Sequence, residues 1–513
     1  MKNNFFNWAR GVIQEVKQNP LVYFLLLIIL AGALFVRVYR LDQLLGFYYD
    51  QGRDAMVIWK LWHDGKAFFI GPVTGLPGIF LGPAYYYLMA PFYKISGGSP
   101  MLPAIFLGVL STSAVFMLYL LGWKMHSRTA GMLASVIGAF SYSLVLSSRW
   151  LSNPTPILLT SLLLVWSMWK IATGGSKWWW VIAAFLTGIS LQFESSSGVF
   201  FIPIMIIFTV WQKKRLPNLP VVFLSLGAFG ATLLPQILFN FRHGNILFQN
   251  FYRVIVEEES FRTSFWEVWN SRFNLYWNVA YSKILPRHNV FAAIFLLLAG
   301  GSLLIGRKAL SKNPALSILL LFITVPVLGF LLFQGNNGNV WDYYLTGFYL
   351  PFVLLFTIGL GHLWRNKMGA VIVVIFLIVF LSSHFGYLRD YLIAGVDGPN
   401  HITLGNQMQA VEWVFEDSRG RDNFNVDVYV PPVIPHAYDY LFLWQATERC
   451  GDALCGMILD QQVPLLYTLY EVDPPHPERL EAWLARQEGI GMVKESIQFG
   501  GITVERRSRI SDE

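Results

Sequence analysis

Long apolar runs are the feature that most constrains this chain. Stretches of about the length that crosses the hydrocarbon core of a bilayer recur at 21–36, 103–122, 156–169, 219–239, 290–305, 315–333 and 368–385. Only 13% of the residues are charged, about half the share found in soluble domains. The chain is therefore predicted to be a polytopic α-helical membrane protein.

Hydropathy and helical periodicity predict about eleven spans. They are expected near 21–38, 102–122, 129–147, 156–171, 178–193, 198–211, 220–240, 289–305, 315–333, 344–362 and 369–386. The first span follows a basic segment, as in a signal peptide. However, Arg37, Tyr39 and Arg40 follow it in place of a small-residue cleavage site, so we expect a retained anchor.

Basic residues predict the orientation. The N-terminal segment and the short loops on one side carry Lys2, Arg10, Lys17, Lys124, Arg128, Lys170, Lys177, Lys213, Lys214, Arg215, Arg307, Lys308, Lys312, Arg365 and Lys367. The positive-inside rule places this side in the cytoplasm. Residues 389–513 and two long loops, 39–101 and 241–288, are then extracytoplasmic. We expect a bacterial or archaeal plasma-membrane protein with a cytoplasmic N-terminus and a membrane domain over 1–388.

Residues 389–513 are predicted to form an extracytoplasmic α/β domain. Helices are expected at 406–418 and 477–487, a strand at 424–430, and a closing hairpin from strands 490–499 and 501–507. Cys450 and Cys455 are disulfide candidates in an oxidising compartment, with two free thiols as the alternative. Within the second long loop, 251–277 is predicted to be an amphipathic helix lying in the membrane interface.

The first long loop opens with an acidic and basic cluster. In the segment FYYDQGRDA (47–55), a helix beginning near Asp50 would place Arg53 and Asp54 on the same face. A carboxylate flanked by Arg stays ionised, which suits a base that accepts a proton from a hydroxyl or an amine. The alternative is that Asp50 is only a helix N-cap, with Asp54 in the first turn.

At this point the chain resembles the GT-C glycosyltransferases, in particular bacterial and archaeal relatives of protein O-mannosyltransferases and lipid A aminoarabinose transferases. The motifs lie in the right order at outer span ends: LGPAYYYLMAP (81–91), SRWLSNPTP (148–156), LPQILFNFRHGN (234–245) and WDYYLTGFYLPF (341–352). The resemblance implies sugar transfer from a polyprenyl-phosphate-linked donor to a protein, lipid or glycan acceptor. It also implies inversion at the anomeric carbon, with Asp50 as the catalytic carboxylate.

The chain departs from the family pattern in several places. The acidic pair common in the first loop is Asp50–Gln51 here, and Asn153 stands where some relatives have a second acid. Glu194 occupies a position where relatives often have His, and it would restore a carboxylate to the site. No Asp-x-Asp is present in the loop, so no cofactor is assigned and a divalent metal is left open.

The donor phosphate would lie at headgroup depth, so its ligands are expected at outer span ends. Cations there are Arg149, Arg242 and His243, with Arg53 nearby, and the two span-end arginines are favoured because Arg binds phosphate bidentately. Their alternative role is headgroup contact. Aromatic candidates are Tyr343 and Tyr344 for phosphate or sugar, and Tyr85, Tyr86 and Tyr87 for a lipid groove. Their alternative is the aromatic belt.

Three other function classes are disfavoured. The net charge of +7 suggests nucleic-acid binding, but no soluble segment has a basic stripe with interleaved aromatics, so no nucleic-acid partner is expected. A transporter or lipid flippase would hold ionisable groups at the bilayer midplane, and the predicted spans have none there. A membrane sensor or scaffold would leave the Asp50 cluster without a role. Membrane lipids and a lipid-linked sugar are the expected partners.

Overall fold

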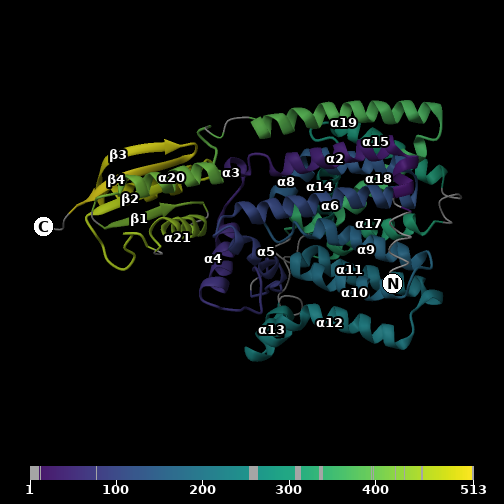
Figure 1. The fold of residues 1–513 in the computed structure, drawn as a ribbon, viewed down its shortest axis with the longest axis horizontal. Coiled ribbons are helices and arrows are strands. Elements are labelled where there is room, and N and C mark those ends of the chain that lie inside the picture. The colour runs from purple at the N-terminus through teal and green to yellow at the C-terminus, as the bar shows by residue number, and fades with distance from the viewer. Residues whose placement is uncertain are drawn as a thin grey trace.

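The computed structural model describes residues 11, 13–76, 78–253, 264–306, 313–333, 339–393, 396, 398–421, 423–431, 434–451 and 454–510. Figure 1 shows a bundle of helices with a small α/β domain at one end, next to helices α3 and α4. The predicted basic residues Lys2, Arg10, Arg307, Lys308 and Lys312 lie outside the described residues.

Apolar helices form the bundle. Six in the described part are long enough to cross a membrane: α2 (Pro20–Val38), α6 (Met101–Met125), α12 (Leu219–Arg242), α17 (Pro314–Leu332), α18 (Thr346–Leu363, extended at its start by the short helix η4, Asp342–Leu345) and α19 (Lys367–Ile393). Two bent pairs each pass as one span: α7 (Arg128–Phe140) with α8 (Tyr142–Arg149), and α14 (Phe265–Ile284) with α15 (Asn289–Ile305). Shorter apolar helices are α9 (Ile157–Ala172), α10 (Trp178–Phe193) and α11 (Ser195–Trp211). Every segment predicted to span the membrane is thus helical.

The predicted span 129–147 is broken rather than straight. Its two helices meet at Ser141 with a bend of 60°. At the break, the amide of Tyr142 donates to His384 Nδ1 (2.9 Å) instead of continuing the helix. The carbonyl of Gly138 accepts from Arg37 Nη2 (2.8 Å). A buried arginine therefore satisfies a carbonyl at the helix end, where helical partners are missing.

The soluble domain packs three helices with a four-stranded sheet. Its elements are α20 (Leu404–Asp417), β1 (Phe424–Tyr429), α21 (His436–Cys450), β2 (Leu465–Glu471), α22 (Pro477–Glu488), β3 (Gly491–Phe499) and β4 (Ile502–Arg509). The strand order is β1-β2-β4-β3, with β1 parallel to β2 and the other pairs antiparallel. The predicted helices, strand and closing hairpin are confirmed, whereas α21 and β2 were not predicted. Cys450 is paired with Cys455, with their Cα atoms 5.5 Å apart.

The first of two long loops connects the bundle to this domain. The first long loop contains α3 (Leu41–Leu44), α4 (Tyr49–His63) and α5 (Ala84–Ile95), and the second contains α13 (Ile246–Tyr252). The predicted interfacial helix is helical from Phe265, where α14 begins, while 254–263 lie outside the described residues. Contacts of α20 with α3 and of α21 with α4 place the soluble domain directly on the first loop.

Candidate functional site

Helix α4 carries the acidic cluster. It begins after Tyr48, whose amide donates to the side-chain Oε1 of Gln51 (3.0 Å). This bond satisfies one amide at the helix start. Asp50 therefore lies inside the first turn and is not the N-cap residue. Its side chain is 51% exposed, so the carboxylate is accessible.

Arg53 connects the two acids of this helix. Its Nη1 lies 2.8 Å from Asp50 Oδ1. Its Nε and Nη2 donate to Asp54 Oδ1 at 3.0 and 2.7 Å, and Tyr86 donates its hydroxyl to the same oxygen at 2.9 Å. Burial raises the pKa of Asp54 to about 6, although Arg53 opposes the shift. Burial lowers the pKa of Arg53, but Asp54 and Asp50 outweigh it and raise the pKa overall.

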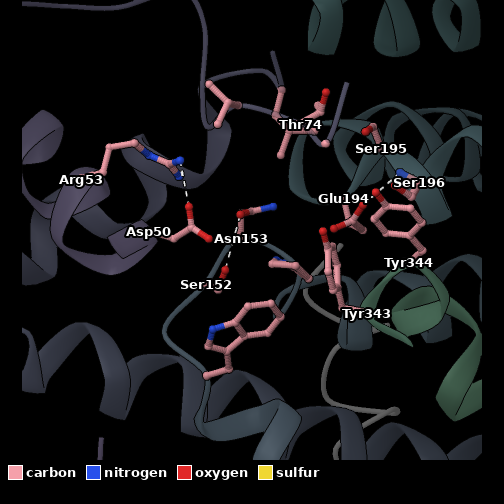
Figure 2. A pocket seen from close by; sticks show the side chains of 15 residues that line it. Asp50, Arg53, Thr74, Ser152, Asn153, Glu194, Ser195, Ser196, Tyr343 and Tyr344 are labelled. Carbon is pink, nitrogen blue, oxygen red and sulfur yellow. Dashed lines mark hydrogen bonds and ion pairs between the residues drawn. The ribbon is translucent and has the colours of Figure 1, made fainter. Parts of the chain in front are cut away.

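A polar cavity of about 550 Å³ gathers residues from distant segments. It is lined by Asp50, Arg53, Val73, Thr74, Gly75, Leu81, Trp150, Ser152, Asn153, Pro154, Glu194, Ser195, Ser196, Tyr343 and Tyr344. Figure 2 shows Asp50 and Arg53 at one side, Glu194 with the two tyrosines at the other, and Asn153 between them. The structure thus brings together five of the predicted site residues and also Asn153. Asp54 lies behind Arg53, outside this lining.

Glu194 is the second carboxylate of the cavity. It stands at the turn between α10 and α11, where its Oε1 accepts from the amide of Ser196 (3.0 Å). The residue is buried, and burial raises the pKa of its carboxyl to about 7. Nearby, Asn153 Nδ2 donates to the carbonyl of Phe193 (2.6 Å), which fixes the side chain of Asn153. The cavity therefore holds one exposed carboxyl group, that of Asp50, and one buried carboxyl group, that of Glu194.

Tyr343 and Tyr344 form an aromatic wall. Both belong to η4, with their ring centroids 4.8 Å apart. The Tyr343 ring also meets the edge of Trp150, at 5.8 Å between centroids. Such a wall offers ring faces on which a sugar can stack. Tyr343 and Tyr344 line the polar cavity, as their predicted place in the site requires. Their predicted roles in binding phosphate or sugar stay predictions.

Arg149 does not line the cavity. Its Nη1 donates to the carbonyls of Val36 (3.1 Å) and Tyr39 (3.0 Å), and its Nε donates to the Tyr391 hydroxyl (3.1 Å). The guanidinium is buried and satisfies carbonyls at the end of α2. Its predicted phosphate role therefore has no contact with the cavity to support it.

The other predicted cations and the tyrosines of α5 also lie away from the cavity. Arg242 is exposed at the end of α12, and His243 stacks on Phe239 with centroids 4.0 Å apart. Tyr85 is fully buried, and Tyr87 donates to the carbonyl of Phe68 (2.9 Å). These tyrosines pack within the first loop, and Tyr86 supports Asp54.

An apolar cavity of about 560 Å³ lies elsewhere, between α14, α17 and α18. Only apolar and aromatic residues line it, among them Val279, Phe322, Pro326, Phe348 and Tyr349. A third cavity shares Tyr349 with it and shares Trp150, Pro154 and Tyr343 with the polar cavity. The three cavities are thus neighbours, in the order polar, intermediate, apolar.

Lys283, which was not predicted, lies beside the intermediate cavity. It is buried at the end of α14, with Nζ 2.7 Å from Ser143 Oγ and 3.5 Å from Asp342 Oδ2. Asp342 and Tyr349 line that cavity, and Nζ lies 4.0 Å above the Tyr349 ring. The sequence signal was weak, because a lysine in an amphipathic segment is normally expected to face solvent.

Among the described residues, no three His, Cys, Asp or Glu side chains are grouped so that they could hold a metal ion. The two carboxylates of the polar cavity stand on different sides of it (Figure 2). No ligand set is therefore assigned.

Comparison with known proteins identifies the fold. Residues 81–238 match the family model of dolichyl-phosphate-mannose-protein mannosyltransferase, and no curated protein matches the chain. ArnT from Cupriavidus metallidurans bound to undecaprenyl phosphate is similar, with a TM-score of 0.58 and 11% identity, over 95% of this chain and 98% of ArnT. The apo form of ArnT has a TM-score of 0.60 and 11% identity, over 94% and 97% of the two chains.

A second solved relative is the archaeal oligosaccharyltransferase AglB from Archaeoglobus fulgidus, in complex with an inhibitory peptide and a dolichol-phosphate. Its TM-score is 0.50 at 11% identity, over 93% of this chain and 73% of AglB. ArnT and AglB are both GT-C proteins. The family match within the membrane part and the similarity along nearly the whole chain agree with the sequence resemblance. This chain therefore has the GT-C fold that ArnT and AglB share.

Proposed function

We propose that this protein is a membrane glycosyltransferase that transfers a sugar from a polyprenyl-phosphate-linked donor to an acceptor, with Asp50 as the catalytic base. The observation that carries the proposal is the accessible Asp50 carboxylate in a polar cavity that shares lining residues with an intermediate cavity, which in turn shares Tyr349 with an apolar one. ArnT bound to undecaprenyl phosphate has the same fold and supports this donor class.

The proposed transfer is a single displacement at the anomeric carbon of the donor. The acceptor oxygen or nitrogen attacks the anomeric carbon, the bond to the phosphate oxygen breaks, and polyprenyl phosphate leaves with the electron pair. The proton of the acceptor passes to Asp50. Arg53 engages Asp50 Oδ1 and leaves Oδ2 for that proton. Attack from the side opposite the leaving group inverts the anomeric centre.

The three neighbouring cavities match the parts of such a donor. The apolar cavity takes the start of the prenyl tail, the intermediate one the phosphate, and the polar one the sugar and the acceptor group. We assign the phosphate contact to Lys283, whose Nζ lies 3.5 Å from Oδ2 of Asp342, a residue that lines the intermediate cavity. Positive charge there would stabilise the charge that grows on the leaving phosphate.

The proposal places the site on the extracytoplasmic face. Glu194 stands at one end of α11, and Lys213, Lys214 and Arg215 follow the other end. Because basic loops mark the cytoplasmic side, the cavity opens at the opposite face. The ion pair of Glu15 with Arg128 (2.7 Å) supports a location of the N-terminal segment on the same side as the basic loops.

The test uses purified protein in nanodiscs, a panel of undecaprenyl-phosphate sugars as donors, and membrane lipid and protein extracts as acceptors. Release of undecaprenyl phosphate is followed by mass spectrometry. We expect release with at least one donor and its loss in Asp50→Asn. Asp64→Asn is the matched control, because Asp64 is an exposed acid at the end of the same helix. Undiminished release by Asp50→Asn would refute the assignment of the base.

A further inference from the structure

The start of the Asp50 helix is held by the soluble domain. The carbonyl of Phe47 accepts from Gln407 Nε2 (2.9 Å), and both residues are completely buried. The hydroxyl of Tyr48 donates to the carbonyl of Ile402 (3.0 Å). Backbone contact extends upstream, where the carbonyl of Leu45 accepts from an amide at the start of α20 (2.8 Å). The segment that leads into α4 is therefore fixed by α20 and the residues before it.

The body of α4 also contacts the soluble domain, at Gly52. A methyl group on Gly52 would overlap the backbone of His436 and Ala437, at the start of α21. One turn earlier on α4, the Tyr49 ring lies against His436 with centroids 4.9 Å apart. Glycine inside a helix costs about 1 kcal/mol relative to alanine. Here it permits a backbone approach that no other residue would allow.

Glu471 is hydrogen-bonded to a residue from each of these two contacts, Gln407 of α20 and Tyr438 of α21. Its Oε1 accepts from the Tyr438 hydroxyl of α21 (2.8 Å) and lies 3.4 Å from Gln407 Nε2 of α20. Glu471 ends β2, and all three side chains are buried. Helix α21, which contacts α4, and helix α20, which holds the segment before α4, are thus joined to each other and to the sheet through the carboxyl group of Glu471.

We propose that the soluble domain is a positioning element for Asp50, acting through Gly52 and through the group formed by Gln407, Tyr438 and Glu471. This inference rests on the proposed function. These residues do not line the cavity; they set where the first turn of α4 stands, and with it Asp50 and Arg53. A base must be held within a fraction of an ångström of its working position, because a displacement of about 1 Å costs about a hundredfold in rate.

The first test is Gly52→Ala, with Gly489→Ala as the matched control. Gly489 lies in the soluble domain that contacts Gly52, its φ is −75°, and an added methyl would make only an ordinary 3.6 Å contact. For Gly52→Ala we expect kcat to fall by about tenfold to a hundredfold, with the KM for the undecaprenyl-phosphate donor nearly unchanged. A misplaced base lowers kcat, whereas the tail cavity still binds the donor.

The second test does not depend on turnover. Hydrogen exchange of the peptide covering 47–56 should quicken in Gly52→Ala and not in Gly489→Ala. Tyr438→Phe removes one buried hydroxyl and should quicken exchange in the same peptide if Gly52→Ala does not fold. Glu471→Gln keeps an acceptor oxygen for Tyr438 and Gln407, so it should retain wild-type kcat, whereas Glu471→Ala should not.

The outcomes separate the two proposals. Faster exchange in 47–56 without turnover by wild-type protein on any donor would remove the proposed function and keep the structural role of the domain. Unchanged exchange in both Gly52→Ala and Tyr438→Phe, or wild-type kcat in a folded Gly52→Ala protein, would overturn the positioning role.

Discussion

Asp50 and Glu194 line one cavity from different sides, and their carboxyls differ in exposure (Figure 2). The side chain of Asp50 is half exposed and paired with Arg53, whereas Glu194 is buried and its pKa is raised to about 7. The cavity therefore combines an accessible carboxyl group with a buried one whose pKa is raised. Both residues are carboxylic acids, so their surroundings account for the difference in exposure.

The buried Glu194 predicts a pH dependence of stability. Its pKa rises from 4.5 to about 7 on folding, so the folded state binds more protons between these values. The contribution of Glu194 to the free energy of unfolding is therefore fully present below pH 4.5 and is lost as the pH rises through 7. The loss amounts to about 3 kcal/mol at most. Glu194→Gln should remove that loss. The melting temperature of the variant relative to wild type should therefore increase from pH 5 to pH 8. A difference that does not change with pH would contradict this prediction.

Lys283 is predicted to bind the donor phosphate. Lys283→Gln should weaken undecaprenyl phosphate binding by about tenfold to a hundredfold, because a hydrogen bond to a charged group is worth about 1.5–3 kcal/mol. The protein should remain folded, since Asp342 is 57% exposed and water can replace its partner. Native mass spectrometry in nanodiscs measures the affinity. Lys213→Gln, an exposed lysine at the basic end of the bundle, is the control. Equal affinity for undecaprenyl phosphate in the two variants would contradict the assignment of Lys283 as a phosphate ligand.

Arg149 is predicted to stabilise the fold rather than bind donor. Arg149→Ala would leave the carbonyls of Val36 and Tyr39 without this donor, at about 1–3 kcal/mol for each unsatisfied buried group. Its melting temperature should fall clearly, while Arg242→Ala, at an exposed position, should leave it unchanged. If Arg149→Ala keeps the wild-type melting temperature but loses undecaprenyl phosphate binding, the phosphate role holds after all.

The bond between Cys450 and Cys455 is predicted to form in protein taken from its native membrane. Mass spectrometry of the unreduced digest should show a cross-linked peptide that disappears on reduction. Two alkylated free thiols before reduction would show that the pair is not oxidised.

Elements that depend on local pattern could be predicted from the sequence. Hydropathy alone locates the helices of the bundle, and the three- and four-residue spacing of Asp50, Arg53 and Asp54 predicts their common face. The break at Ser141 could not be predicted in this way, because it depends on Arg37 and His384 from other helices.

Residue roles at the outer span ends were harder to predict for a related reason. A guanidinium near headgroup depth can bind phosphate or cap a neighbouring helix, and only the tertiary fold decides between them. Arg149 has its carbonyl partners on α2, more than a hundred positions away in the chain. Lys283 was overlooked because its burial beneath η4 depends on the packing of α14 against α8 and α18.

The position of the apolar cavity bears on which donors the proposed enzyme can distinguish. Its lining residues lie mainly on α14, α17 and α18, and it shares only Tyr349 with the intermediate cavity. Under the proposed function, these residues contact only the part of the isoprenoid tail next to the phosphate. Donors with truncated, water-dispersible isoprenoid tails should therefore substitute for the natural ones.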